Sequence, residues 1–150
     1  MSKAFTSEEP ADEPPPVRPA PRLAPGEVRW VTPEGRAELV ETLARLRAAG
    51  DPRARQVEDT LAILTVLGPE SAPEGTVAFG CWVTVEDDAG ARNTWRIVGP
   101  DEADPRRDRV SAHSPVGRAL IGATLGDEVE VSRPGGARVL KVVHIGRLSP

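Results

Sequence analysis

The chain has 150 residues, enough for one modest domain with an appendage. Its 23 acidic and 19 basic residues give a formal charge of −4, which excludes a global basic field for direct nucleic-acid binding. One cysteine and two histidines exclude an internal disulfide and leave too few ligands for a thiolate or transition-metal centre. No apolar run approaches membrane-spanning length and the first residues lack a signal pattern, so we predict a cytoplasmic protein with no membrane contact and no cofactor.

Residues 1–29 contain seven prolines and few large apolar side chains. Such a segment cannot bury enough apolar surface to offset the entropy lost on ordering. We therefore predict a disordered or polyproline-like tail. We interpret it as a passive extension, and the alternative is a tether or a proline-motif ligand.

Residues 30–70 are predicted to form a short antiparallel helical hairpin. The first helix begins with Thr32 as its N-cap, and its leucine repeat ends at Gly50. The second helix begins with Asp51 as its N-cap, and its apolar seam continues to Gly68. With about 16–18 residues in each helix, the hairpin would project only about 25 Å.

After residue 75 the apolar residues alternate, which predicts β-strands. The expected strands are 76–87, 93–99, a short one around Val110, 128–132 and 137–148. The order is therefore two helices, three strands, one short helix and two strands. We predict an α+β fold, in which an antiparallel sheet carries the short helix on one face.

The short helix is predicted from the stretch "SPVGRALIG". Ser114 is a good N-cap, Pro115 fits the first helical position, and Gly122 supplies a left-handed stop. Leu120 and Ile121 fall on one face of this helix and are predicted to lie in the core.

Three ordered stretches, "IVGPDEAD", "SPVGRALIG" and "LGDEVEV", resemble the C-terminal domain of the GreA/GreB transcript cleavage factors. The resemblance covers residues 30–147. In that family a helical hairpin precedes an FKBP-like globular domain, so it implies a hairpin at 30–70 and a Gre-type domain at 75–150. The hairpin is shortened, as in the related regulator of nucleoside diphosphate kinase, Rnk.

The resemblance also implies a partner. In the family, the globular domain docks on RNA polymerase at the rim of the secondary channel, against a coiled coil of the largest subunit. Carried onto this sequence, the docking residues are His113, Ser114, Pro115 and Arg118. His113 departs from the small polar or acidic residue usual there, and Ser114 and Pro115 are alternatively a structural cap alone. Nucleic acid would be contacted only indirectly, through the polymerase.

The hairpin tip differs from that of cleavage-competent members, which have a longer coiled coil with acidic tip residues that help to hold a magnesium ion. Here the corresponding stretch is "GDPRARQ". Asp51 matches the first acid, but Ala54 stands where a glutamate is needed, and Arg53 and Arg55 add opposing charge. We therefore expect a polymerase-binding elongation regulator that does not stimulate cleavage, is not an enzyme and holds no metal.

The sequence also allows other functional hypotheses. They are an Rnk-like role in nucleotide metabolism, true cleavage stimulation, and a prolyl isomerase of FKBP type. The isomerase would need an aromatic-walled pocket, for which the domain offers Phe79, Trp82 and Trp95.

The remaining reactive side chains are assigned ordinary structural roles. Cys81 is expected to be a buried thiol and His144 a sheet-surface residue. The charged stretch 101–109 is expected to be a solvated loop, within which Asp101 and Glu102 either stabilise the loop or make a contact.

Overall fold

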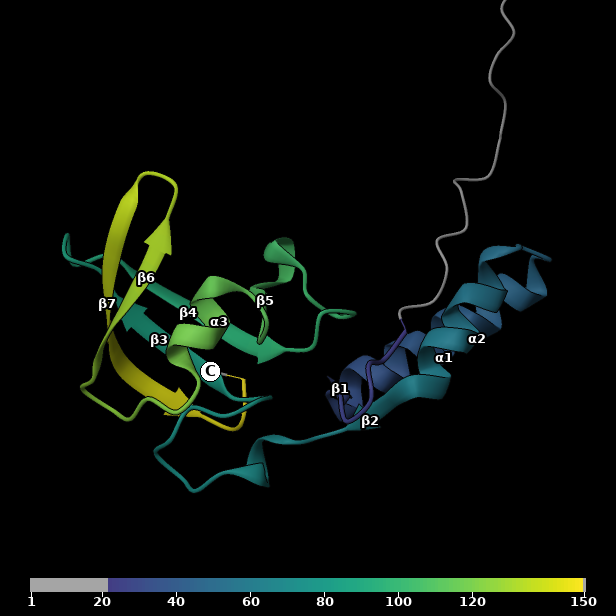
Figure 1. Cartoon of the computed structure of the whole chain (residues 1–150), viewed down its shortest axis with the longest axis horizontal. Helices are drawn as coiled ribbons and strands as arrows, with labels where there is room; N and C mark the ends of the chain where they lie inside the picture. Colours follow the sequence, from purple (N-terminus) through teal and green to yellow (C-terminus); the bar gives the residue numbers. More distant parts are fainter. Residues whose placement is uncertain (1–21, 150) are drawn as a thin grey trace, which may run out of the picture.

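The computed structural model of the chain describes residues 22–149. Figure 1 shows a pair of helices that extends away from a curled sheet, with a connecting segment running between the two parts. Residues 1–21, which make up most of the predicted tail, lie outside the described residues. Between residues 22 and 149, no helix has the length and apolar character needed to cross a membrane.

The helical pair consists of α1 (Pro33–Ala48) and α2 (Arg53–Ile63), which pack on each other. The predicted N-cap of α1 is confirmed, because the hydroxyl of Thr32 accepts a hydrogen bond of 3.0 Å from the backbone N–H of Gly35. The turn after α1 contains Gly50 at a φ of 66°, a conformation that glycine adopts without a steric penalty.

The second helix is shorter than the sequence predicts. It ends at Ile63, and the next three residues form β2 (Leu64–Val66) instead of continuing towards Gly68. Strand β2 pairs in parallel with β1 (Arg29–Val31), an element that the sequence analysis did not predict. The helix ends there because the backbone of Leu64–Val66 pairs with a strand over 30 positions earlier, which local propensity cannot reveal.

Five strands form the sheet of the second part, in the order β5–β4–β3–β7–β6. They are β3 (Trp82–Glu86), β4 (Arg92–Val98), β5 (Arg109–Ser111), β6 (Glu128–Arg133) and β7 (Gly136–Gly146). Two 3₁₀ turns, η1 (Pro69–Ser71) and η2 (Pro105–Arg107), lie in the connections. The α+β prediction is confirmed.

One pair of strands departs from the predicted antiparallel pattern. Strands β4 and β5 are parallel, whereas the other three pairs of the five-stranded sheet are antiparallel. A parallel pair cannot be joined by a tight turn, so the segment 99–108 crosses over between them. That crossover carries the charged stretch of the sequence to the side of the sheet that faces the hairpin, as Figure 1 shows.

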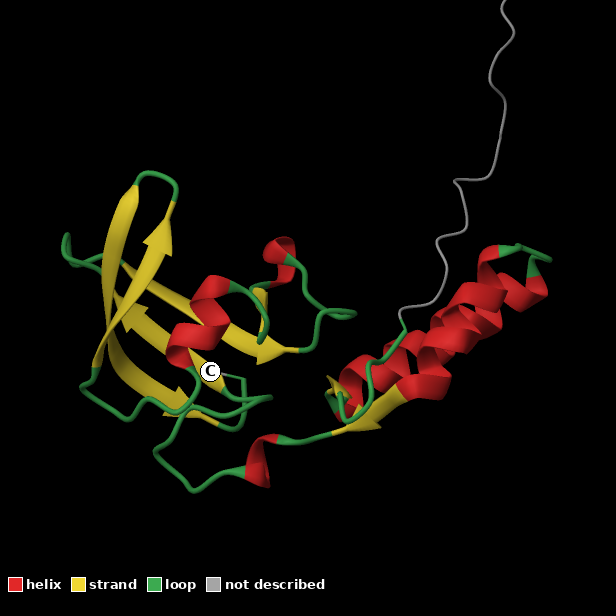
Figure 2. Ribbon diagram, in the orientation of Figure 1, coloured by secondary structure: helices red, strands yellow, loops and turns green. Residues whose placement is uncertain are grey.

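The short helix α3 (Pro115–Leu120) packs against the sheet, as Figure 2 shows. Its core partners are aliphatic side chains from four strands and the neighbouring connections: Val77, Val83, Val85, Ile97, Ala123, Val131, Leu140 and Val142. Leu120 is fully buried among them, as predicted. The prediction for Ile121 is wrong, because this side chain is 39% exposed. Ile121 caps the helix in an extended conformation, which turns its side chain out of the helical face.

These two neighbouring residues provide a test of the core. We expect Leu120→Ala to lower the free energy of unfolding by about 2–5 kcal/mol, because it leaves a cavity in the core. Ile121→Ala should cost less than about 1 kcal/mol, because much of that side chain already contacts water. Urea unfolding of both variants measures the difference, and equal costs would contradict the assignment of the core.

Candidate docking surface

The start of α3 is held in one conformation by local hydrogen bonds. The hydroxyl of Ser114 accepts from the N–H of Gly117 at 3.1 Å and donates to the carbonyl of Ser111 at 2.7 Å. The N–H of His113 donates to the Ser111 hydroxyl at 3.1 Å. Gly117 is needed here, because a Cβ at this position would collide with the Ser111 carbonyl. The loop is therefore ordered by bonds within the chain, with no contribution from a partner.

The predicted docking residues lie together on this loop and the first turn of α3. His113, Pro115 and Arg118 are exposed, whereas Ser114 is half-buried because it caps the helix. Among the hydrogen bonds and ion pairs of the described residues, none involves the side chain of Arg118. The surface thus offers a cation and a proline ring on a fixed backbone.

A shallow apolar groove adjoins this loop. Its volume is about 340 Å³, and it runs between β5, η2 and the start of α3. Its lining residues are Trp95, Ala103, Pro105, Asp108, Arg109, Val110, Ser111, Ser114 and Val116. This groove is not predictable from the sequence, because Trp95 and Val116 come from elements that only the fold brings together.

The hairpin tip carries one carboxylate, and an arginine occupies it. Arg53 donates to both oxygens of Asp51 at 2.7 to 3.1 Å, and this contact lowers the pKa of the Asp51 carboxyl. Pro52, not the predicted Asp51, stands in the N-cap position of α2, although the Asp51 carboxylate still accepts the Arg53 N–H at 2.8 Å. Arg55 pairs with Asp59 at 3.4 Å. Within residues 22–149, no group of three potential metal ligands is present.

The base of the hairpin meets the sheet at a buried carboxylate. Glu102 is 7% exposed and accepts hydrogen bonds from the N–H and the hydroxyl of Thr32 and from the N–H of Gly99. From the sequence, Glu102 is expected either to stabilise its loop or to make a contact. In the structure it does both, because Gly99 belongs to its own loop and Thr32 caps α1.

Ion pairs surround this buried contact. Glu38 of α1 binds Arg109 at 2.8 Å and Arg107 at 3.0 Å, so the stretch 101–109 is not merely the solvated loop that the sequence predicts. Its charges are drawn to the hairpin by opposite charges on α1. Two further pairs, Arg96–Glu34 and Arg29–Asp101, join the same two parts of the chain at 2.9 and 2.6 Å.

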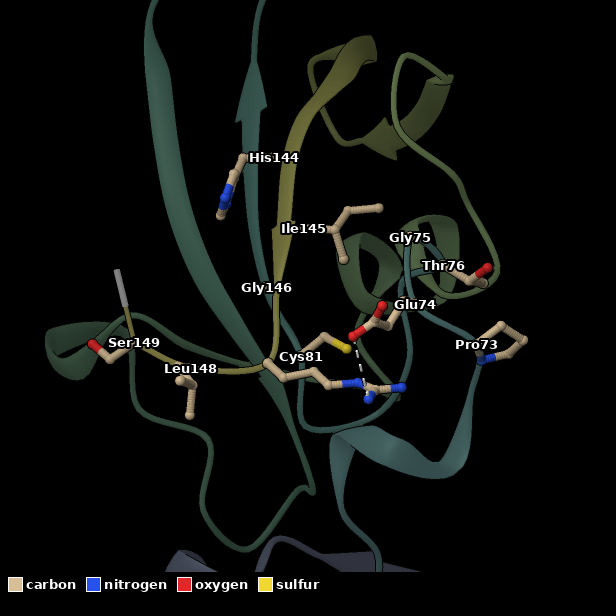
Figure 3. Close-up of a pocket in the computed structure, with 11 residues that line it drawn as sticks. Pro73, Glu74, Gly75, Thr76, Cys81, His144, Ile145, Gly146, Leu148 and Ser149 are labelled. Carbon is tan, nitrogen blue, oxygen red and sulfur yellow. Dashed lines mark ion pairs between the residues drawn. The ribbon is translucent and has the colours of Figure 1, made fainter.

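A larger cavity, of about 520 Å³, lies beside the last residues of β7 and the residue that precedes β3 (Figure 3). Cys81 and His144 both line it, and as predicted the thiol is buried and the imidazole is exposed. Figure 3 shows the His144 ring and the Cys81 side chain well apart, so the two do not form a thiol–imidazole pair. Arg147 crosses the cavity towards Glu74, at 3.8 Å.

The three aromatic residues considered for an isomerase pocket lie in different places. Phe79 packs edge-on against Trp30, with 5.8 Å between ring centroids, at the base of the hairpin. Trp82 lies beneath the guanidinium of Arg96 at 5.9 Å, and Trp95 lines the groove beside α3. They do not form one aromatic wall.

Comparisons with known proteins identify the class to which this fold and surface belong. Residues 72–147 match the family model "Transcription elongation factor, GreA/GreB, C-term". The chain belongs to the GreA/GreB family.

Individual relatives come from both branches of this family. The chain is 40% identical to the transcription elongation factor GreB of Yersinia pestis over 109 residues, covering 73% of this chain and 63% of that protein. It is 36% identical to the transcription elongation factor GreA of Chelativorans sp. over 138 residues, covering 79% and 88%. A GreA/GreB structure from Nitrosomonas europaea is 26% identical with a TM-score of 0.45, covering 79% of this chain and 98% of that one. The chain thus spans less than two thirds of the Yersinia GreB.

Family membership corrects one expectation from the sequence. We predicted that the chain is not an enzyme, and this prediction is wrong in the light of its relatives. GreA and GreB factors stimulate transcript cleavage, a nuclease-like activity. Cleavage stimulation therefore belongs among the activities to be measured for this chain.

The ion pairs of Glu38 predict a pH dependence. Hydrogen bonds from Arg109 and Arg107 lower the pKa of Glu38 from 4.5 to about 2. Because the pKa is lowered in the folded state, these pairs stabilise the fold above pH 4.5 and lose that effect as the pH falls towards 2. The stabilisation should be less than about 1 kcal/mol, because the carboxylate is 40% exposed.

Urea unfolding of the wild type and Glu38→Gln measures this effect. We expect the wild type to be the more stable protein at pH 6.5, and the gap to close as the pH falls from 4.5 towards 2. A gap that is independent of pH would show that the ion pairs do not carry the difference.

Proposed function

We propose that the chain binds RNA polymerase at the rim of its secondary channel and regulates transcription there, without stimulating transcript cleavage. One observation carries the proposal. A family member presents a rigid loop with three exposed side chains, His113, Pro115 and Arg118, directly beside an apolar groove. A surface that is already ordered loses little conformational entropy when a partner binds.

The chemistry of this surface suits the coiled coil of the largest polymerase subunit. A coiled coil presents regularly spaced apolar and charged side chains on one helical face. One apolar side chain would enter the groove beside Trp95, and an acidic one would pair with Arg118. Ser114 holds the loop for this contact without needing to touch the partner.

The parts of the chain then have separate roles in the proposal. Residues 75–150 form the docking domain, residues 30–70 the projecting hairpin, and residues 1–29 the tail. Helix α1 has 16 residues and is therefore about 24 Å long, so the hairpin reaches only a short way into a channel. Contact with nucleic acid is indirect, through the polymerase in the cytoplasm.

The hairpin tip supports the absence of cleavage stimulation. Two-metal chemistry needs closely spaced carboxylates that are free to bind a cation. Asp51 is the single carboxylate in the turn, both its oxygens accept from Arg53, and Ala54 offers no ligand. Arginines at 53 and 55 would also repel a magnesium ion.

Binding to core RNA polymerase tests the docking surface. We expect Pro115→Ala to weaken binding severalfold and Arg118→Glu to weaken it at least about tenfold, because a reversed charge faces the partner. Arg133→Glu makes the same charge change at the exposed end of β6 and should bind like the wild type. Equal binding by all four proteins would contradict the assignment of the surface.

A transcript cleavage assay on stalled elongation complexes tests the hairpin tip. We expect no acceleration by this chain under conditions in which a GreB with an acidic tip accelerates cleavage, because no carboxylate at the tip is free. Saturable acceleration by the wild type would refute this part of the proposal and leave the docking surface unaffected.

A further inference from the structure

We infer that Glu102 completes the N-terminal cap of α1 from the other part of the chain, and that this shared cap sets the direction of the hairpin relative to the docking surface. In an ordinary capping box, the N-cap Ser or Thr is followed three residues later by Glu or Gln, whose side chain accepts the N-cap N–H. Here the N-cap is Thr32, but the third residue after it is Gly35, which has no side chain.

Glu102 supplies the missing carboxylate. One of its oxygens accepts the N–H of Thr32 at 2.8 Å, which is the bond that a glutamate in position 35 would make. Its other oxygen accepts the Thr32 hydroxyl. A Cβ on Gly35 would collide with this carboxylate, so the glycine leaves room for an acid from elsewhere in the chain.

The same carboxylate is tied to the sheet. The oxygen that accepts the N–H of Thr32 also accepts the N–H of Gly99, at 3.0 Å. Gly99 directly follows β4. A Cβ on Gly99 would collide with the carbonyl of Trp30 in β1, so the two segments approach at backbone distance. Moving the hairpin away from the sheet would therefore leave α1 without part of its cap and a carboxylate without its donors.

Separating the hairpin from the sheet costs more free energy than breaking a surface contact, because it leaves a buried carboxylate without its hydrogen bonds. Glu102 is 7% exposed, and a buried carboxylate is tolerated only where its hydrogen bonds are satisfied. The surrounding ion pairs are more exposed, with Glu34 at 58% and Glu38 at 40%, so each contributes less to the orientation. Glu102 is thus the residue that positions the hairpin relative to the sheet, and the ion pairs make a smaller contribution to the same orientation.

The chain offers a variant pair that separates helix capping from hairpin direction. Glu102→Ala removes the shared carboxylate. Combining it with Gly35→Glu restores a carboxylate within α1, in the space that Glu102 vacates, while Gly99 stays without an acceptor. Glu102→Gln is the conservative variant, because its amide oxygen can still accept both N–H groups. Glu130→Ala removes an exposed acid from β6 and is the matched control.

Hydrogen exchange of two amides in the full chain reports the two roles separately. We expect Glu102→Ala to speed exchange at both Thr32 and Gly99, by about fivefold for the lost cap. The double variant should restore protection at Thr32 but not at Gly99. Restored protection at both amides would overturn the inference, because capping alone would then hold the junction.

Distances between spin labels at Arg55→Cys and Arg133→Cys report the hairpin direction, in a background with Cys81 replaced by alanine. We expect a single narrow distribution of distances for the labelled protein without a further substitution, for Glu102→Gln and for Glu130→Ala. Glu102→Ala and the double variant should both give a broad distribution. A narrow distribution in Glu102→Ala would overturn the inference.

The consequence for transcription rests on the proposed function. We expect Glu102→Ala to bind polymerase with unchanged affinity, because α3 is intact, but to lose the regulatory effect of the hairpin. Reduced affinity would contradict this separation of docking from direction. If the wild type does not bind polymerase, the proposed function fails, whereas the exchange and distance measurements still decide the shared cap.

Discussion

A buried carboxylate between two parts of the chain is the constraint on which the rest of this structure depends. Glu102 accepts hydrogen bonds from Thr32 at the start of α1 and from Gly99 at the end of β4. Neither part of the chain alone supplies all three donors. Because burying a carboxylate without them is unfavourable, the helical hairpin and the sheet are held in one arrangement. Two glycines, Gly35 and Gly99, provide the space that this arrangement needs.

That constraint gives the molecule two ends with different chemistry. Beside the sheet, the start of α3 is ordered by its own hydrogen bonds and flanked by an apolar groove, and this is the surface that we propose for docking. The hairpin points away from the sheet and ends in a turn whose carboxylate is occupied by an arginine (Figure 1). A sheet that carries this surface, together with a short arm whose tip carboxylate is bound by an arginine, is consistent with the proposed regulator of RNA polymerase.

Features that depend on neighbouring residues were predictable. Thr32 and Ser114 cap their helices as expected, because an N-cap hydrogen bond spans only three positions. Burial of Leu120 and Cys81 also followed from the apolar pattern. The pattern failed where the chain leaves its regular element. Ile121 adopts an extended conformation and turns outward, and the segment after Ile63 pairs with a strand instead of continuing the helix.

The sequence by itself determined the starts of α1 and α3, the alternation of the strands and the motifs that resemble the family, because each depends on residues within a few positions of one another. Only the tertiary structure decided how the hairpin joins the sheet. The partners at that junction are 62 to 72 positions apart, as in Arg96–Glu34, Thr32–Glu102 and Arg29–Asp101. Local patterns carry no information on such pairs. One local feature pointed to this junction. The N-cap Thr32 is followed by Gly35 at the position where a glutamate would complete the capping box, and only the structure shows that Glu102 supplies that carboxylate.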